Sequence, residues 1–337
     1  MTTSLVPSPS GGPPAQTPDA LVRASALVTP AVDAAVRQLD PSLHAPIRHH
    51  LAGGGKHVRA GLACLGAAAA GGREVDGVPG AVAVELVHNY SLLHDDIIDG
   101  DRERRHLPTV WARFGEGVAI VAGDALAALA MQVLLETPTP ARVDAARRLA
   151  NANQAMIAGQ AADMAFEARA RVTVDECLAM ERGKTGALLS AACAIGAVLG
   201  GGDAAVALAL GAYGEHLGIA FQAIDDVLGV WGEPSVTGKP VGADLFARKK
   251  TLPVAVALQA GGDAAQELES ILSSTPTASL VARATVLMEE SGARDTVTAI
   301  AERHLRAALH ALDDTDLVAG PKEELVAVAR YVTARDR

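Results

Sequence analysis

Apolar residues recur three or four positions apart over most of the chain, which is the spacing of amphipathic helices. Glycine and proline clusters interrupt this pattern, and the strict alternation typical of strands is scarce. The pattern therefore predicts an all-α protein. We expect helices over residues 21–39, 42–51, 79–99, 117–136, 140–171, 174–199 and 204–230, with further amphipathic helices from Leu252 to Val332.

The composition is consistent with a large helical core. Of the 337 residues, 50% are hydrophobic, 20% are charged and only 3% are aromatic. Such a chain can bury one large core or two ordinary ones, and we expect a single all-α domain over residues 21–337. The net charge of −10 argues against nucleic acid or an anionic membrane as a general partner, although a local basic site can exist within an acidic total.

The three cysteines, Cys64, Cys177 and Cys193, stand singly among alanines and leucines. They have no metal-ligand spacing and are typical of reduced core residues in a cytoplasmic protein. The longest uncharged run, Gly186 to Gly202, approaches the length of a membrane span but is rich in Ala, Gly and Ser and has no aromatic belt. We interpret it as a buried core helix and expect no membrane span.

Residues 1–20 contain five of the 17 prolines and no charged side chain before Asp19. This composition cannot bury enough apolar surface to offset the entropy lost on ordering, so it predicts a disordered Pro/Gly/Ser-rich tail. The basic and apolar regions of a secretory signal do not follow. The tail is interpreted as a linker or, alternatively, as a docking peptide for a larger assembly.

Three carboxylates stand at the end of the apolar helix predicted over residues 79–99. Asp95 and Asp99 lie one turn apart on one helix face, with Asp96 beside them. Like charges at this spacing destabilise a helix by roughly 0.2–0.5 kcal/mol per pair, and negative charge in the last turn opposes the helix dipole. The arrangement indicates a bound cation, or else a solvated acidic helix end.

A second aspartate pair, Asp225 and Asp226, ends another alanine-rich apolar helix. A solvated helix end is the simpler interpretation of either pair alone. Two such ends, more than a hundred residues apart, instead suggest carboxylates that face each other across a cavity.

Positive charge is concentrated in two short segments. Gly53–Gly55 interrupts the chain before Lys56 and Arg59, where a helix N-terminus and two cations suit an anion. A basic loop, Arg102–Thr109, follows the first aspartate cluster. This loop is either a surface ion-pair network or the arginine half of a metal–phosphate site.

Lys184 and Thr185 begin a very apolar segment. A lysine at this position either extends its charged end to the solvent or has a role in the function. Residues 232–250 contain two prolines, three glycines and several cations, which predicts a lid over an anionic substrate. Asp124 and Asp163 interrupt apolar faces, and we interpret both as hydrogen-bonded helix-packing residues.

Together these segments resemble the trans-isoprenyl diphosphate synthases, the polyprenyl synthetase family, and especially geranylgeranyl diphosphate synthases of actinobacterial type. The match runs from Gly53 to Leu252 with all blocks in family order. Residues 95–99 resemble the first aspartate-rich motif of the family and residues 225–229 the second. Gly229 stands where many members carry a further aspartate, so the second motif is one carboxylate short.

The resemblance implies a single large helical bundle of the isoprenoid synthase type with a central cavity. It also implies a Mg²⁺-dependent prenyltransferase that condenses isopentenyl diphosphate with allylic diphosphates of C5 to C15. The allylic diphosphate ionises, the double bond of isopentenyl diphosphate attacks the carbocation, and a proton is lost. Metal ions and fixed cations stabilise the charge that grows on the leaving diphosphate. Three Mg²⁺ ions per site and a homodimer are expected by resemblance.

The resemblance further implies a role for each matching residue. The metal ligands would be Asp95, Asp99 and Asp225, with Asp96 and Asp226 in support. The allylic diphosphate would be held by Arg104, Lys184 and Lys239, with Lys249 nearby and Asp244 supporting the closed site. Isopentenyl diphosphate would be held by Lys56, Arg59, His88 and Arg105, while Thr185 and Gln222 face the carbocation.

Tyr90 is the first bulky side chain on the path of the growing hydrocarbon, five residues and about 7.5 Å before Asp95. With the small Ser91 beside it, this segment resembles members that stop at geranylgeranyl diphosphate (C20). Val87 and Ala83 leave room if Tyr90 tilts away, so C15 and C25 products stay open. Tyr90 can also be an ordinary buried aromatic residue.

Three other functions compete. A head-to-head synthase of squalene or phytoene type would carry two Asp motifs of different surroundings and would lack the Gly-Lys-Pro lid. A terpene cyclase shares the fold and the first motif but needs no isopentenyl site, and Lys56, Arg59 and Arg105 argue against it. A non-catalytic regulatory subunit of a prenyl synthase typically loses one aspartate motif, whereas both pairs are present here. We therefore expect a cytoplasmic enzyme whose partners are diphosphate substrates.

Overall fold

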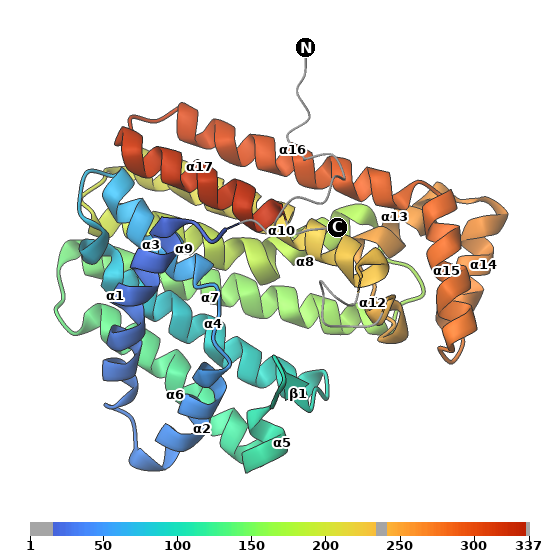
Figure 1. Cartoon of the computed structure of the whole chain (residues 1–337), viewed down its shortest axis with the longest axis horizontal. Coiled ribbons are helices and arrows are strands. Elements are labelled where there is room, and N and C mark those ends of the chain that lie inside the picture. The colour runs from blue at the N-terminus through green and yellow to red at the C-terminus, as the bar shows by residue number, and fades with distance from the viewer. Residues whose placement is uncertain (1–15, 234–240, 335–337) are drawn as a thin grey trace.

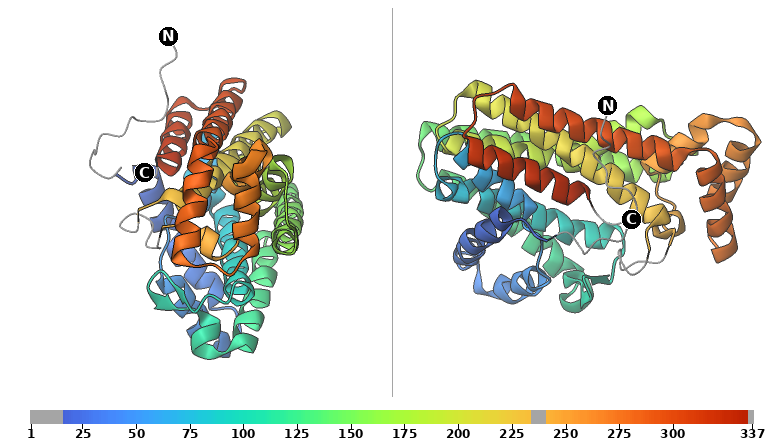
Figure 2. Two further views of the ribbon diagram at one scale, coloured as in Figure 1. Left: turned by 90° about the vertical axis from the view of Figure 1, so that its right-hand side faces the viewer. Right: turned by 45° about the horizontal axis from the view of Figure 1, so that its top comes forward.

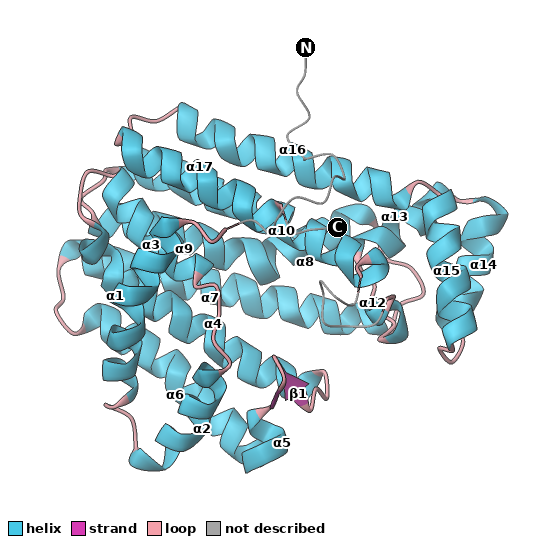
Figure 3. Cartoon of the chain, viewed as in Figure 1, coloured by secondary structure: helices cyan, strands magenta, loops and turns pink. Residues whose placement is uncertain are grey.

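The computed structural model describes residues 16–233 and 241–334. Within these ranges the chain is helical apart from loops and one antiparallel hairpin of strands β1 (Glu103–Arg104) and β2 (Leu107–Pro108) (Figure 3). The predicted all-α class is confirmed. The helices are α1 (Asp19–Val36), α2 (Pro41–Ala52), α3 (Val58–Ala69), η1 (Glu74–Gly77), α4 (Val78–Ile98), α5 (Val110–Phe114), α6 (Glu116–Leu135), α7 (Pro140–Glu167), α8 (Val174–Glu181), η2 (Arg182–Gly186), α9 (Ala187–Leu199), α10 (Ala204–Trp231), α12 (Ala243–Phe246), α13 (Leu252–Ala260), α14 (Gly262–Ser273), α15 (Ala278–Glu290), α16 (Ala293–Asp313) and α17 (Ala319–Thr333).

Long helices form the body of the molecule. α10 packs against α9 and α16, α9 packs against α3 and α7, and α4 packs against α6. In Figure 1, α16 and α17 (red) lie along one side of the bundle, and α14 and α15 (orange) stand at one end. Figure 2 shows the same bundle from two further directions. The hairpin directly follows α4, so the basic loop begins where the first aspartate motif ends.

Buried apolar side chains form two clusters. The larger gathers side chains from α1 to α7, α9, the first part of α10 and α17. The smaller gathers side chains from α8, the last part of α10 and α13 to α15. α16 contributes to both clusters, as α10 does. The second aspartate motif lies on the part of α10 that belongs to the smaller cluster.

The cysteines and the uncharged run have the environments expected of core residues. All three cysteines are free and buried, and α9 is buried along most of its length. Two of the described helices, α6 and α10, are long and apolar enough to cross a bilayer, and 39% and 50% of their apolar windows are buried inside the fold. A core helix meets the same criterion, so this finding does not separate the two cases.

Most helix boundaries agree with the sequence pattern, but one predicted helix is not continuous. The segment predicted over residues 174–199 is divided by η2, a π-helical turn between α8 and α9. Such turns are frequent at functional sites, and this one carries Lys184 and Thr185. Asp124 was predicted to be a hydrogen-bonded helix-packing residue; 69% of its side chain is exposed, and its Oδ1 lies 3.8 Å from His94 Nε2 of α4.

Two predictions fall on parts of the chain outside the described residues. Residues 1–15 of the predicted tail (residues 1–20) are outside the described ranges. So are residues 234–240 of the predicted lid. Lys239, one of the predicted diphosphate-binding residues, belongs to the second of these ranges.

Candidate active site

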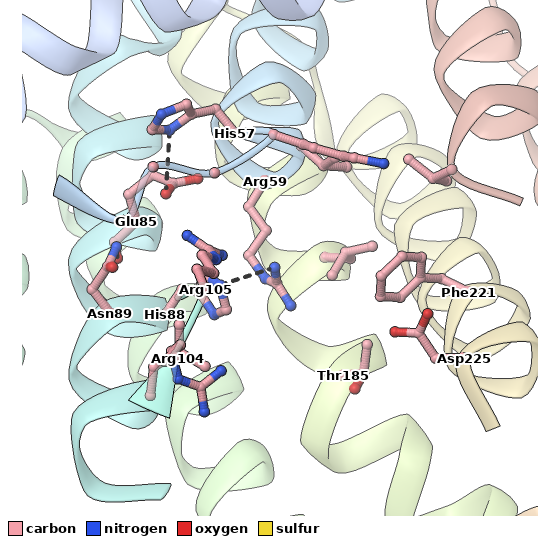
Figure 4. A pocket seen from close by; sticks show the side chains of 18 of the residues that line it. His57, Arg59, Glu85, His88, Asn89, Arg104, Arg105, Thr185, Phe221 and Asp225 are labelled. Atoms are coloured by element: carbon pink, nitrogen blue, oxygen red, sulfur yellow. Dashed lines mark hydrogen bonds and ion pairs between the residues drawn. The ribbon is translucent and has the colours of Figure 1, made fainter. Parts of the chain in front are cut away.

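A cavity of about 600 Å³ opens beside α4, α10, η2 and the start of α3 (Figure 4). Its polar lining is mostly basic. The polar, charged and aromatic side chains that line it are Lys56, His57, Arg59, Glu85, His88, Asn89, Arg104, Arg105, Thr185, Phe221, Gln222 and Asp225. The four residues predicted to hold isopentenyl diphosphate therefore line one cavity, although they come from α3, α4 and the hairpin.

Three cations of this cavity have no carboxylate partner. Lys56, Arg59 and Arg105 form no ion pair within 4.0 Å with any residue that the structure describes. The Nε atom of Arg59 is buried without a hydrogen-bond partner, and burial lowers the pKa of this guanidinium. Lys56 and Arg105 are exposed, while Glu85 and Asp225 act to raise the pKa of Arg59 but do not offset its burial. Three cations around one cavity, one of them with an unpartnered buried Nε atom, indicate an anionic ligand with several oxygen acceptors.

Side chains of α4 orient these cations. Arg59 Nη1 lies 3.4 Å from His88 Nε2. Burial, and then repulsion from Arg59, brings the pKa of His88 well below its ordinary value, so a neutral His88 accepts from the guanidinium. Glu85, which was not predicted, accepts a hydrogen bond from Ala60 N at 3.2 Å and lies 3.6 Å from His57 Nδ1. Its signal in the sequence is a carboxylate in the middle of an apolar run.

Arg104 joins the basic loop to the first aspartate motif (residues 95–99). Its Nε donates to Asp96 Oδ1 at 2.7 Å, and its side chain also lines the cavity. The Asp96 side chain is 1% exposed and that of Arg104 is 30% exposed. This pair is therefore partly buried, unlike the surface network that was the alternative interpretation of the loop.

The other two carboxylates of the first motif face cations from distant elements. Lys249 Nζ lies 3.5 Å from Asp99 Oδ2. Burial raises the pKa of Asp95, Lys184 acts to lower it, and Asp99 acts to raise it. Asp95 and Asp99 thus repel each other as expected of carboxylates one helical turn apart, and the lysines partly offset that repulsion.

Lys184 pairs with a carboxylate of α7. Its Nζ donates to Asp163 Oδ2 at 2.6 Å. Gly159, one turn before Asp163, permits this approach, because a Cβ at that position would lie 2.4 Å from Lys184 N. Asp163 is therefore a hydrogen-bonded residue where α7 meets η2, as predicted, and its partner is a predicted site residue. The contact between α7 and η2 that creates the pair could not be read from the sequence.

Hydrogen bonds connect η2 to the second aspartate motif (residues 225–229). Thr185 Oγ1 donates to Gln222 Oε1 at 3.0 Å, and Gln222 Nε2 donates to Asp226 Oδ1 at 2.9 Å. Leu252 N donates to Asp226 Oδ2 at 3.0 Å. Burial raises the pKa of Asp226 to about 7. Asp226 is thus turned into the fold, whereas its neighbour Asp225 lines the cavity.

The carboxylates Asp95, Asp99 and Asp225 are oxygen donors of the kind that Mg²⁺ prefers. Among the described residues, no group of three or more His, Cys, Asp or Glu side chains converges on one point. Mg²⁺ commonly takes one or two carboxylates and completes its shell with water and substrate phosphates. The donor set therefore fits metal ions shared with a phosphate ligand, rather than a closed metal cage.

The two residues predicted to set chain length do not line the cavity. Tyr90 is buried, its hydroxyl donates to Asn153 Oδ1 of α7, and its ring meets His94 edge-on. Ser91 Oγ donates to His88 O at 2.8 Å. Tyr90 therefore lies between α4 and α7 and is not among the residues that line this cavity, and its role in chain length stays a prediction.

The chain is similar to known proteins both in sequence and in structure. The polyprenyl synthetase family profile matches residues 40–288. A (2E,6E)-farnesyl diphosphate synthase of Mycobacterium tuberculosis is 42% identical over 325 residues, which cover 92% of this chain and 90% of the relative. A geranylgeranyl diphosphate synthase of the same organism is 45% identical over 285 residues, which cover 84% and 80%. The crystal structure of a polyprenyl synthetase from Streptomyces coelicolor A3(2) matches with a TM-score of 0.89 at 46% identity, covering 93% of this chain and 98% of that one.

Proposed function

Because the chain belongs to the polyprenyl synthetase family and is a chain-elongating prenyl diphosphate synthase, we propose that its main product is geranylgeranyl diphosphate (C20). The substrates would be isopentenyl diphosphate and allylic diphosphates of C5 to C15. One observation supports this function above others: three cations without carboxylate partners, Lys56, Arg59 and Arg105, share a cavity with Asp225. A terpene cyclase has no need of a second diphosphate site of this kind.

The two substrates would occupy different parts of the site. Lys56, Arg59 and Arg105 would bind the diphosphate of isopentenyl diphosphate, with neutral His88 orienting Arg59. The allylic diphosphate would lie between the two aspartate motifs, where Lys184 and Lys249 approach Asp95 and Asp99. When the diphosphate binds, Lys184 would either exchange Asp163 for a diphosphate oxygen or contact the diphosphate while Asp163 holds it in place.

Mg²⁺, when bound by Asp95, Asp99 and Asp225, would neutralise charge on the leaving diphosphate. The protein's own part is to align the double bond of isopentenyl diphosphate with the allylic carbon and to exclude water. Thr185 and Gln222 present oxygen dipoles from a hydrogen-bonded pair, so neither needs to reorganise as positive charge develops. The proton lost in the last step would go to the departing diphosphate. We propose three Mg²⁺ ions per site, as in the family resemblance.

The direct test is to incubate the protein with isopentenyl diphosphate and C5, C10 or C15 allylic diphosphates, with and without Mg²⁺, and to measure product length. We expect Mg²⁺-dependent elongation that stops mainly at C20. Absence of elongation from every primer would overturn the enzymatic proposal and favour a regulatory subunit. A product that stops at C15 would favour the second candidate, a farnesyl diphosphate synthase, which is also the name of one similar protein.

Chain length can be tested separately at Tyr90. The Tyr90→Ala variant should lengthen the product, because it opens space between α4 and α7 near the growing hydrocarbon. Tyr90→Phe is the matched control: it keeps the ring and loses only the hydrogen bond to Asn153, so product length should be kept. Unchanged product length in Tyr90→Ala would remove Tyr90 from this role.

We also propose that the chain forms a homodimer. The proposal is supported by the family resemblance and by large apolar side chains exposed on α6 and α7, of which the most exposed on these two helices are Val121 and Val143 at 52% each, with Ile157 and Met164 at 47% each. Light scattering coupled to size-exclusion chromatography should give twice the mass of 34.4 kDa, and Val121→Glu should shift it toward the monomer.

A further inference from the structure

The hairpin of β1 and β2 has a strained turn. Arg104 pairs with Leu107 across the hairpin, so its loop consists of two residues, Arg105 and His106. Their φ angles are 52° and 64°, and positive values at both positions are what a two-residue type I′ turn requires. Such turns favour asparagine and glycine, and left-handed backbone is uncommon for any residue that has a Cβ atom. Contacts with the rest of the fold must therefore hold this turn in place.

The last turn of α2 supplies one such contact through His49. His49 Nε2 lies 2.7 Å from Pro108 O of β2. A carbonyl oxygen can only accept a hydrogen bond, so Nε2 carries the hydrogen and Nδ1 of the neutral ring is an acceptor. Arg113 Nη1 of α5 donates to this Nδ1 at 3.1 Å, and the His49 ring meets Phe114 edge-on. His49 therefore joins the second strand of the hairpin to α2 and α5.

His50, the next residue of α2, lies at the other side of the hairpin. Together with Asp96, Arg104 and Arg105 it lines a second, small cavity of about 20 Å³. Burial, and then repulsion from the two arginines, lowers the pKa of His50 to about 4, so its ring is neutral at pH 7. His50 Nε2 and Asp96 Oδ2 are both buried, and neither has a hydrogen-bond partner among the described residues.

A cavity of about 20 Å³ can hold one water molecule, provided that polar groups line it. The Asp96 carboxylate accepts hydrogen bonds, and a nitrogen of a neutral imidazole either donates or accepts, so one water can serve both unpartnered atoms. The other oxygen of Asp96 already accepts from Arg104 Nε at 2.7 Å. Such a water would therefore connect α2 to the first strand of the hairpin.

We propose that His49 and His50, the histidine clamp, are positioning residues that hold the hairpin and its two arginines in the strained form. His49 acts directly on β2, and His50 acts through a bound water. Arg104 contacts the first aspartate motif, and both Arg104 and Arg105 line the large cavity. One clamp therefore positions the cations of both diphosphate sites. The inference rests on the proposed function for the roles of the two arginines.

Steady-state kinetics of chain elongation test the clamp. His49→Phe keeps an aromatic ring beside Phe114 and loses both hydrogen bonds, and His50→Phe keeps the ring and loses its polar atoms. Each should raise KM for isopentenyl diphosphate and for the allylic diphosphate by about fivefold or more, with kcat within about threefold. Partial unfolding would instead lower kcat and leave KM unchanged, because it reduces only the amount of active enzyme.

Two matched variants test how the clamp acts. His50→Gln keeps a polar end that can bond the same water, so both KM values should stay within about twofold of those of the unsubstituted protein. His106→Gly removes a side chain that is 91% exposed and relaxes the turn. Alone it should leave the kinetics unchanged. In the His49→Phe background it should recover most of the lost affinity, since a turn without strain needs less support.

Unchanged KM values in either Phe variant would overturn the proposal, and so would an equal rise in His50→Gln and His50→Phe. Thermal unfolding shows which variants fold, and the two His50 variants test the clamp even if His49→Phe does not fold. Arg105→Gln separates failure of the clamp from failure of the proposed function. If it raises KM for isopentenyl diphosphate and the Phe variants do not, only the clamp is wrong. If it leaves this KM unchanged, the proposed role of the arginine is wrong as well.

Discussion

Asp96 and Asp226 hold the same place in the two aspartate motifs, yet they are buried against different kinds of partner. Asp96 accepts a hydrogen bond from the guanidinium of Arg104 at 2.7 Å. Asp226 accepts hydrogen bonds only from neutral groups, Gln222 Nε2 and Leu252 N, among the contacts that the structure describes. Arg104 therefore offsets part of the cost of burying Asp96, although burial still raises the pKa of that carboxyl, and none of the described hydrogen bonds to Asp226 comes from a cation.

The neighbours of Asp226 increase this difference. Glu181 is 1% exposed, neither of its carboxylate oxygens has a hydrogen-bond partner among the described residues, and burial together with Asp226 raises its pKa well above the ordinary value. Two buried carboxyl groups in contact cannot both ionise without large cost. In both motifs one aspartate of the pair faces outward and the other is buried, because neighbours on a helix point in different directions. The comparison teaches that contacts with distant segments then decide whether the buried aspartate is ionised.

The largest effect should come from the two aspartates that face outward. Asp95→Asn and Asp225→Asn should each lower kcat/KM for chain elongation by about 10²–10³-fold, because each removes a fixed negative charge from the proposed metal site. Burial raises the pKa of Asp95, so the charged form is disfavoured in the folded state. Asp95→Asn should therefore keep or slightly raise the free energy of unfolding at pH 7.

The matched control for these variants is Asp124→Asn, which removes a carboxylate that is 69% exposed on α6. It should leave both kcat/KM and stability unchanged. Full activity in Asp95→Asn would contradict the division of labour between outward and inward aspartates.

The helical class, most helix boundaries and the residues of the basic cavity could be predicted from sequence. Apolar spacing and the Gly and Pro breaks are local properties of the chain, and Lys56, Arg59 and Arg105 stand in short distinctive segments. The π-helical turn was not predictable, because a Lys-Thr-Gly segment continues an ordinary helix pattern equally well.

The other features of the site could not be predicted, because they depend on contacts between segments that are distant in the sequence. The Lys184–Asp163 pair joins residues 21 positions apart on elements whose approach depends on Gly159. In the same way Asp244 of α12 approaches Gly229 of α10 so closely that a Cβ at position 229 would lie 1.9 Å from Asp244 Oδ2. Lys239 lies outside the described residues, and the role of Tyr90 stays a prediction.

A second effect concerns the pH dependence of stability. Burial raises the pKa of Asp226 from an ordinary value near 4 to about 7 in the folded state. The folded protein then binds the proton more tightly than the unfolded chain, so this contribution is fully present below about pH 4 and is lost as the pH rises through 7. The loss is on the order of a few kcal/mol. Asp226→Asn should remove it.

This effect is measured as a difference, by urea unfolding of the metal-free protein and of Asp226→Asn from pH 4 to 8. His50 and His304, whose pKa values are lowered to about 4 by burial, act in the opposite direction in both proteins. Their contributions cancel in the difference, which therefore reports Asp226 together with Glu181, whose pKa Asp226 raises. A difference that is constant with pH would show that neither carboxyl gains a proton on folding because of Asp226.

The smallest of the three effects should be at Asp96, and it should have the opposite sign from that at Asp226. Burial raises the pKa of Asp96 and so favours a neutral side chain there, as at Asp95, but Asp96 also pairs with Arg104. Asp96→Asn leaves this guanidinium with a neutral acceptor in a partly buried site, and should destabilise the protein by about 1 kcal/mol at pH 7. Asn at position 226 can instead keep its bond from Leu252 N, and the Gln222 amide can reverse because the Thr185 hydroxyl both donates and accepts.

Urea unfolding at pH 7 should therefore rank the proteins with Asp96→Asn least stable and Asp226→Asn at least as stable as the unsubstituted chain. Arg104→Gln in the Asp96→Asn background supplies the control. Once the charge of Asp96 is gone, removing the guanidinium should cost little or be favourable, since it no longer has a buried carboxylate to compensate. If both aspartate variants lose the same stability, the electrostatic difference between the two motifs is not real, and only their shared burial matters.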